Sequence, residues 1–72
     1  MTADDVRKLL QRACDDAGSQ RAWAMRHGVS VVYVNDVLGG NREPGPAILQ
    51  VLGLEAERRT TYRKVTRGHE HG

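Results

Sequence analysis

The chain has 72 residues and a formal net charge of +2, and 39% of its residues are hydrophobic, 4% aromatic and 28% charged. Because domains usually contain roughly 100–200 residues, this size and balance predict one small soluble domain and exclude a large catalytic cleft between domains. The sequence has no apolar run of about 18–20 residues, no signal-peptide core at its start and a single cysteine. We therefore expect no membrane span and no internal disulfide, and a protein of the reducing cytoplasm.

The first predicted element is a helix over residues 3–17. Its apolar residues recur at the spacing of one helical face, at Val6, Leu9, Leu10, Ala13, Cys14 and Ala17. Thr2 is suited to cap its start, and Gly18 is suited to end it. Since Cys14 lies on the apolar face, we expect its thiol to pack in the core and to be unreactive.

Two shorter helices are predicted next. Ser19 is suited to cap a helix that ends at Gly28, and Ser30 is suited to cap a helix that ends at Gly39-Gly40. Trp23 lies in an apolar part of the first of these helices. We therefore expect its ring to be a core anchor and not a platform for stacking.

The last predicted helix is short. It follows a turn-rich stretch at 41–46, in which two prolines prevent a helix from continuing. Pro46 suits the first turn of this helix, and Gly53 suits its end. Beyond Leu54 the apolar content falls, and residues 60–66 have strand-forming preferences without clean alternation. We expect a short edge strand or an ordered arm there.

Residues 20–38 have the pattern of a helix-turn-helix, in which two helices are joined by a short turn that contains a glycine. Ala24 is small enough to let the helices approach closely, Gly28 can adopt the left-handed conformation of the turn, and Val29 can fill the corner. The second helix is predicted to face the core through three apolar residues, Val34, Val37 and Leu38.

The opposite face of that helix is predicted to point outward. At about 100° per residue, it consists of Val32, Asn35, Asp36 and Gly39, with Val31 and Tyr33 on its two flanks. In a helix-turn-helix this face enters the major groove of DNA, and its N-terminal residues lie nearest the bases.

With these residues the sequence resembles the Cro and lambda-repressor-like (XRE-type) family. The positions that match its pattern are Gln20, Ala24, Gly28, Val29, Val34 and Val37, and the helix order matches over roughly residues 3–54. The resemblance implies an all-α, lambda-repressor-like domain of four short helices, with a candidate C-terminal β-strand or arm. It also implies a small transcriptional regulator, expected to be a repressor, that binds near-palindromic operator DNA as a homodimer in a bacterial cell or a phage-infected host.

The resemblance also implies a set of DNA contacts. Gln20 matches the family residue that holds a phosphate, and Asn41 and Arg42 lie in the loop that meets the DNA backbone. Base-facing positions are Val31, Val32, Asn35 and Asp36, and the candidate set also includes Ser30 and Tyr33. Chemically, asparagine can pair with adenine, valine can contact thymine methyl groups, and the start of the third helix can hold a phosphate.

Three features depart from the family pattern. The recognition helix has no Lys or Arg and carries only the negative charge of Asp36, the N-terminal helix is slightly acidic, and no fifth helix is evident. An alternative function is therefore an interaction module on the same scaffold, such as an antitoxin or an antirepressor. A third alternative is an architectural DNA binder without sequence preference.

Residues 58–72 form a basic segment after the predicted DNA-binding domain at 1–57. Three roles are open for it: a solvated tail, a phosphate-binding arm, or a strand that pairs with its counterpart across a dimer. The candidate contacts are Arg59, Thr61, Tyr62, Arg63 and Val65.

The sequence contains no recognisable arrangement of catalytic residues, so we do not expect an enzyme. The run from His69 to His71 lies at the chain end, where we do not expect a metal site. We also expect no cofactor and no small-molecule effector, which leaves double-stranded DNA and a second copy of the chain as the predicted partners.

Overall fold

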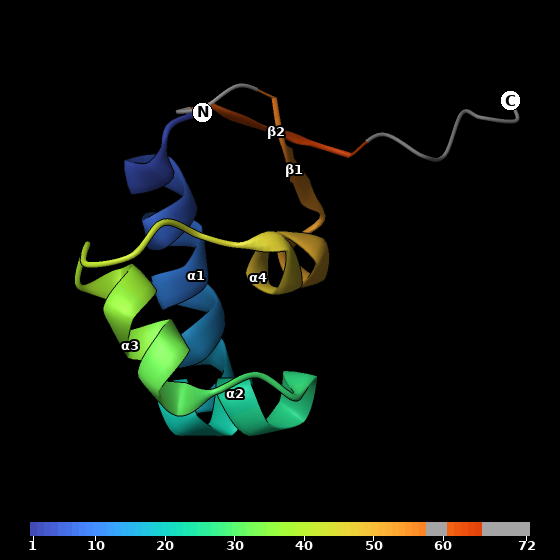
Figure 1. The fold of residues 1–72 in the computed structure, drawn as a ribbon. Helices are drawn as coiled ribbons and strands as arrows, with labels where there is room; N and C mark the ends of the chain where they lie inside the picture. The colour runs from blue at the N-terminus through green and yellow to red at the C-terminus, as the bar shows by residue number, and fades with distance from the viewer. Residues whose placement is uncertain (58–60, 66–72) are drawn as a thin grey trace, which may run out of the picture.

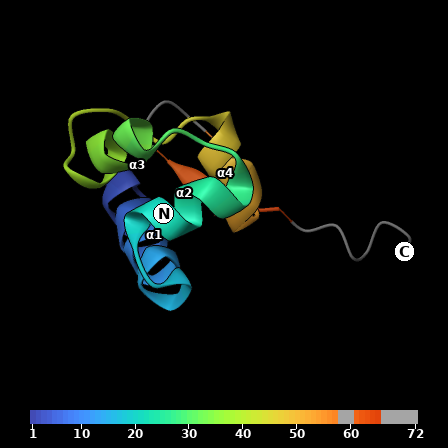
Figure 2. The same cartoon turned by 90° about the horizontal axis from the view of Figure 1, so that it is seen from below.

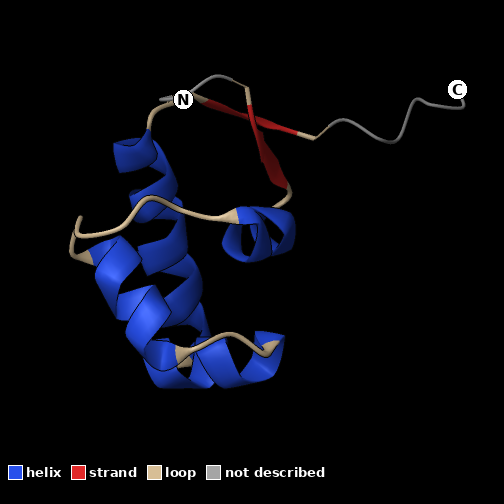
Figure 3. Ribbon diagram, in the orientation of Figure 1, coloured by secondary structure: helices blue, strands red, loops and turns tan. Residues whose placement is uncertain are grey.

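The computed structural model describes residues 1–57 and 61–65. Its first four elements are helices, α1 (Ala3–Ala17), α2 (Gln20–His27), α3 (Val31–Leu38) and α4 (Pro46–Leu52) (Figure 1). Two short strands follow, β1 (Leu54–Ala56) and β2 (Tyr62–Lys64). The described chain is therefore mostly helical with a small sheet, whereas the sequence predicted an all-α domain with one candidate strand (Figure 3).

The helices begin and end where the sequence predicted. At three helix starts a side-chain hydroxyl accepts a backbone N–H from three residues further on, at Thr2, Ser19 and Ser30. Each bond satisfies a donor that the first turn of a helix leaves without a partner. Between α2 and α3, Gly28 has a φ of +69°, and this left-handed conformation turns the chain sharply. These boundary predictions are confirmed.

The long helix α1 organises the other helices around it. It contacts both α2 and α3, and α2 also contacts α3. In Figure 1, α3 and α4 lie on either side of α1, and α2 crosses its lower end. The view from below shows α2 lying across the other helices (Figure 2). The pair α2 and α3 is thus held against a single supporting helix.

Most of the core is one group of buried residues, which we call the helical cluster. It consists of Leu10, Cys14, Trp23, Ala24, Val34, Val37 and Ile48. Each of the four helices contributes to it, and no polar side chain of the described residues is buried with it. The predictions that Cys14 and Trp23 pack in the core are confirmed.

A second, smaller group lies between α1, α4 and the strands, and we call it the hairpin cluster. It consists of Val6, Leu49, Leu54 and Tyr62. Leu52 packs against both clusters, so the two groups adjoin. Burial raises the pKa of the Tyr62 phenol, because the ionised form is disfavoured away from water. With 4% of its surface exposed, Tyr62 is a core residue of this chain, and its contact with a partner stays a prediction.

The strands form an antiparallel pair in which Glu55 lies opposite Arg63. The Arg63 guanidinium donates to the Glu55 carboxylate across the pair. On the other side of β2, the Tyr62 N–H donates to the Met1 carbonyl at 2.7 Å, and Thr61 forms a bridge with Thr2. The predicted C-terminal strand is therefore present, but its partner within the chain, β1, was not predicted.

Candidate nucleic-acid interface

Helix α3 has one face in the core and one face in solvent. Val34 and Val37 are fully buried in the helical cluster, whereas Val32 is 68% exposed. Asn35 is exposed beside Val32, one helical turn further along, and Asp36 is half-buried. The predicted inward positions of Val34 and Val37 and the outward positions of Val32 and Asn35 are confirmed, whereas Asp36 is only partly exposed. The exposed face is short and neutral apart from one carboxylate.

The two flanking residues of α3 lie between its buried and its exposed face, as the sequence predicted. Val31 and Tyr33 are half-buried and pack against the helical cluster. The Tyr33 hydroxyl accepts a hydrogen bond from the Gly45 backbone N–H at 2.6 Å. The guanidinium carbon of Arg42 lies 5.5 Å from the centre of the Tyr33 ring. Tyr33 therefore faces the loop between α3 and α4 and not the Val32–Asn35 surface.

The starts of α2 and α3 each provide backbone donors. Gln20 is the first residue of α2 and is half-buried, directly after the capping residue Ser19. The Ser30 hydroxyl caps α3 by accepting the Tyr33 N–H at 3.3 Å. Because the first N–H groups of a helix have no acceptor within it, both starts can donate to an anion.

The loop after α3 brings further polar groups to the other, C-terminal end of that helix. The Asn41 N–H donates to the Asp36 carbonyl at 2.9 Å, which tightens the end of α3. Arg42 is exposed, as expected for a side chain that contacts a phosphate. A Cβ at Gly40 would lie 3.8 Å from Nη2 of Arg7, so this α1 side chain also lies beside the loop.

Arg7 is the polar neighbour of the loop that sequence reasoning missed. Its side chain is 27% exposed and also forms an ion pair with Asp4 at 3.3 Å. No pattern along the chain links residue 7 to residue 40, because their contact depends on how α1 lies against the end of α3. With Arg42, it places two guanidinium groups around one loop.

The thiol of Cys14 does not contribute to this surface. It is free, buried in the helical cluster, and burial raises its pKa. A thiol with a raised pKa is seldom ionised at neutral pH and is a poor nucleophile. Its geometry therefore supports packing as its role.

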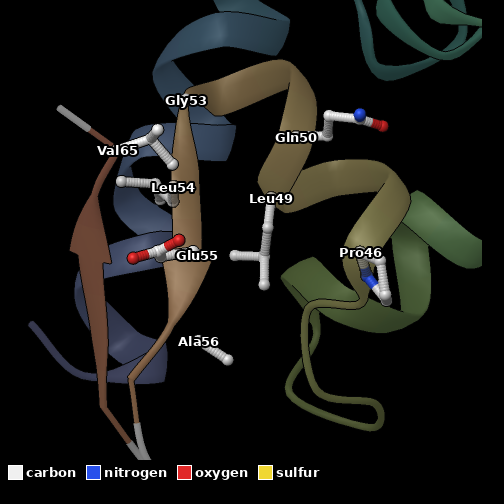
Figure 4. A pocket seen from close by; sticks show the side chains of 8 residues that line it. All are labelled: Pro46, Leu49, Gln50, Gly53, Leu54, Glu55, Ala56 and Val65. Carbon is white, nitrogen blue, oxygen red and sulfur yellow. The ribbon is translucent and has the colours of Figure 1, made fainter. Parts of the chain in front are cut away.

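A groove of about 610 Å³ lies elsewhere, between α4 and the strands (Figure 4). The residues that line it are Pro46, Leu49, Gln50, Gly53, Leu54, Glu55, Ala56 and Val65. Among the described residues that line it, Glu55 is the only titratable one, and its carboxylate is paired with Arg63.

Within residues 1–57 and 61–65, no group of three or more His, Cys, Asp or Glu residues is arranged to hold a metal ion. The predicted contact Arg59 and the run from His69 to His71 lie outside the described residues. No helix among the described residues is both long and apolar enough to span a membrane.

Comparisons of the chain with models of known protein families, with curated proteins and with solved structures found no match.

Proposed function

We propose that the protein is a small DNA-binding regulator, in which α2 and α3 act as a helix-turn-helix. The observation that carries this proposal is the two-sided character of α3. Val34 and Val37 are fully buried and hold the helix in place, while Val32 and Asn35 project from the opposite face into solvent. A fixed helix with an exposed face of this kind fits the major groove, which admits one helix.

The contacts divide into two classes. Asn35 can pair with the edge of an adenine, and Val32 can contact a thymine methyl group, so these residues would select the sequence. Gln20, Ser30, Asn41 and Arg42 surround the helix starts and the loop, where they would hold phosphates and position the protein without selecting a base. The proposed mechanism is steric, because a bound repressor occupies the operator.

Two copies are proposed to bind one near-palindromic operator. A dimer places two recognition helices about 34 Å apart, one turn of B-DNA, which strengthens the limited affinity of one helix. Arg63 and Val65 are exposed at the hairpin and are the candidate partner contacts. Val65→Glu should turn a dimer into a monomer in native mass spectrometry, whereas an unchanged dimer would remove this surface from the proposal.

The first experiment is titration of the protein with a random duplex at low salt, followed by a salt series. A regulator should bind with a Kd of about 10⁻⁴–10⁻⁶ M, and the affinity should fall steeply as salt rises. Selection of sequences from a random duplex pool then reports the base preference and the half-site spacing. A folded chain that shifts no duplex would contradict the proposed function.

Two substitutions test the division of contacts. Asn35→Ala should lose about 1–3 kcal/mol of discrimination at one base pair of the selected operator. Arg42→Ala should weaken binding to every sequence and reduce the salt slope by about 0.9, the value for one phosphate. Arg12→Ala removes the same charge from an exposed position on α1 and should have little effect. Equal losses on all sequences for Asn35→Ala and Arg42→Ala would show that the division is wrong.

A second candidate function is a protein-interaction module, and it rests on a different observation. Met25 and Val32 are each 68% exposed, and α3 carries no positive charge to offset Asp36. A module of this class would use these exposed apolar side chains as its contacts with a partner protein. A module of this class should fail to bind random duplex at low salt, so the same titration separates the two functions.

A further inference from the structure

Backbone hydrogen bonds attach both ends of the segment between α3 and α4, residues 39–45, to the neighbouring helices. At its start the Gly40 N–H donates to the Val37 carbonyl, and at its end the Gly45 carbonyl accepts the Leu49 N–H. Arg42 lies between these two ends and is exposed. The contacts of Tyr33 explain how this middle part is oriented.

Tyr33 makes the longest-range side-chain hydrogen bond to this segment. Its hydroxyl accepts the Gly45 N–H at 2.6 Å, between residues 12 apart in sequence and in a half-buried setting. The ring packs against the helical cluster, so the hydroxyl has a defined position. A hydrogen bond shielded in this way joins the end of the loop to α3, the helix with the proposed base contacts.

Gly45, the donor of this hydrogen bond, leaves space for the Tyr33 hydroxyl. Its φ of −96° is a conformation that any residue adopts, so backbone geometry does not require glycine here. A Cβ at this position would collide with the Tyr33 hydroxyl. The absence of a side chain at Gly45 therefore lets the tyrosine hydroxyl approach the backbone this closely.

The same tyrosine also orients the cation of the loop. The Arg42 guanidinium lies over the ring, 5.5 Å from its centre, within the range of a cation–π interaction. A side chain that is already oriented loses less conformational freedom when it binds a partner. Tyr33 thus acts on the loop twice, through its hydroxyl at Gly45 and through its ring at Arg42.

We infer that Tyr33 is a positioning residue, which contacts no base itself but holds Arg42 and its loop ready to bind a DNA phosphate beside α3. This inference rests on the proposed function. It replaces the sequence-based prediction that Tyr33 is itself a contact of the recognition helix. It also explains why an aromatic ring with a hydroxyl is found on the flank of α3, where packing alone would accept any large apolar side chain.

The test begins with the free protein. Tyr33→Phe keeps the ring beneath Arg42 and removes only the acceptor of the Gly45 N–H. Amide exchange at Gly45 should accelerate by about 10-fold, while the amides of α1 keep their protection. Gly45→Ala tests the same contact from the other side and should shift the Tyr33 ring resonances. Unchanged exchange at Gly45 in Tyr33→Phe would overturn the inference without any DNA.

The second part measures binding to a random duplex for Tyr33→Phe, Arg42→Ala and the double variant. Tyr33→Phe should weaken binding by about 2- to 10-fold, with the salt slope retained because no charge is lost. In the Arg42→Ala background it should have no further effect. In the Arg12→Ala background, which serves as the control, the two effects should add.

The outcomes separate this inference from the proposed function. Duplex binding in which the effects of Tyr33→Phe and Arg42→Ala simply add would overturn the role of Tyr33 and leave the DNA-binding proposal standing. A wild-type protein that binds no duplex would overturn the proposed function, and with it the role of Tyr33 in binding. If Tyr33→Phe weakens duplex binding when Arg42 is present and has no effect in the Arg42→Ala background, the result would support both the inference and the proposed function.

Discussion

The helical cluster and the hairpin cluster are built in different ways. The helical cluster joins residues from four capped helices, and its turn between α2 and α3 contains only a few residues. The hairpin cluster joins Val6, near the start of the chain, to Tyr62, near the end of the described residues. The proposed DNA-binding face belongs to α3, which packs on the helical cluster alone. The comparison shows that the candidate site depends on the part of the core that the four helices make together, and not on the part that joins the two ends of the described chain.

The hairpin cluster stabilises the other end of the molecule. Its strands contain three residues each, and a pair of this length has little stability unless it packs against a helix. Contacts to Met1 and Thr2 and burial of Tyr62 provide that packing. Closing so long a stretch of chain costs conformational entropy, so we expect this cluster to open before the helical cluster does.

The largest effect is expected from a cavity in the helical cluster. Ile48 is fully buried there, and Ile48→Ala should lower the free energy of unfolding by about 2–5 kcal/mol. In a domain this small, that loss should also reduce the affinity for DNA, since α3 loses its support. Urea unfolding followed by the fluorescence of Trp23 measures it. A loss below about 1 kcal/mol would contradict the view that this cluster dominates the stability.

A cavity in the hairpin cluster should act more locally. Tyr62→Ala should remove amide protection from Arg63, which pairs with Glu55 of β1, and from Val65, whose N–H donates to the Gly53 carbonyl. Both interactions depend on the hairpin. Protection of Val34 and Val37 in α3 should change little. Hydrogen exchange followed by NMR makes the comparison. Equal loss of protection at both places would mean that the two clusters unfold as one unit.

A gain in stability is expected at the edge of the hairpin. The Thr61 hydroxyl oxygen is buried and has no hydrogen-bond partner among the described residues. Burying a hydroxyl in this state is unfavourable, so Thr61→Val should raise the free energy of unfolding by about 1 kcal/mol. Thermal unfolding monitored by circular dichroism measures the change. A decrease would indicate that this hydroxyl does find an acceptor.

The smallest effect concerns alkaline pH. Because burial raises the pKa of Tyr62 in the folded chain, the phenol binds its proton more tightly there than in the unfolded chain. The stabilisation is complete below the ordinary pKa of tyrosine, about 10, and is lost as pH rises through the higher folded value. Tyr62→Phe should show a weaker loss of stability above pH 10 than the wild type. Denaturant unfolding at a series of pH values tests the difference, and parallel curves would contradict it.

The sequence alone determined the elements that depend on nearby residues. The helix caps Thr2, Ser19 and Ser30 are at the predicted places, because a capping hydroxyl and the backbone N–H that donates to it are only three residues apart. The inward face of α3 was also predictable, since Val34 and Val37 repeat at helical spacing. The same periodicity identified the exposed positions of Val32 and Asn35.

Tertiary structure alone decided what depends on residues distant in the chain. No local sequence pattern predicts three of the observed contacts. These are the pairing of β1 with β2, the burial of Tyr62 against Val6, and the contact of Arg7 with the loop. The hydrogen bond between the Gly45 N–H and the Tyr33 hydroxyl could not be predicted either. The two residues are 12 positions apart, and the path of the loop between them decides whether these atoms meet. The physical reason is that helix caps and periodicity are properties of a few successive residues, whereas these contacts exist only after the helices have packed.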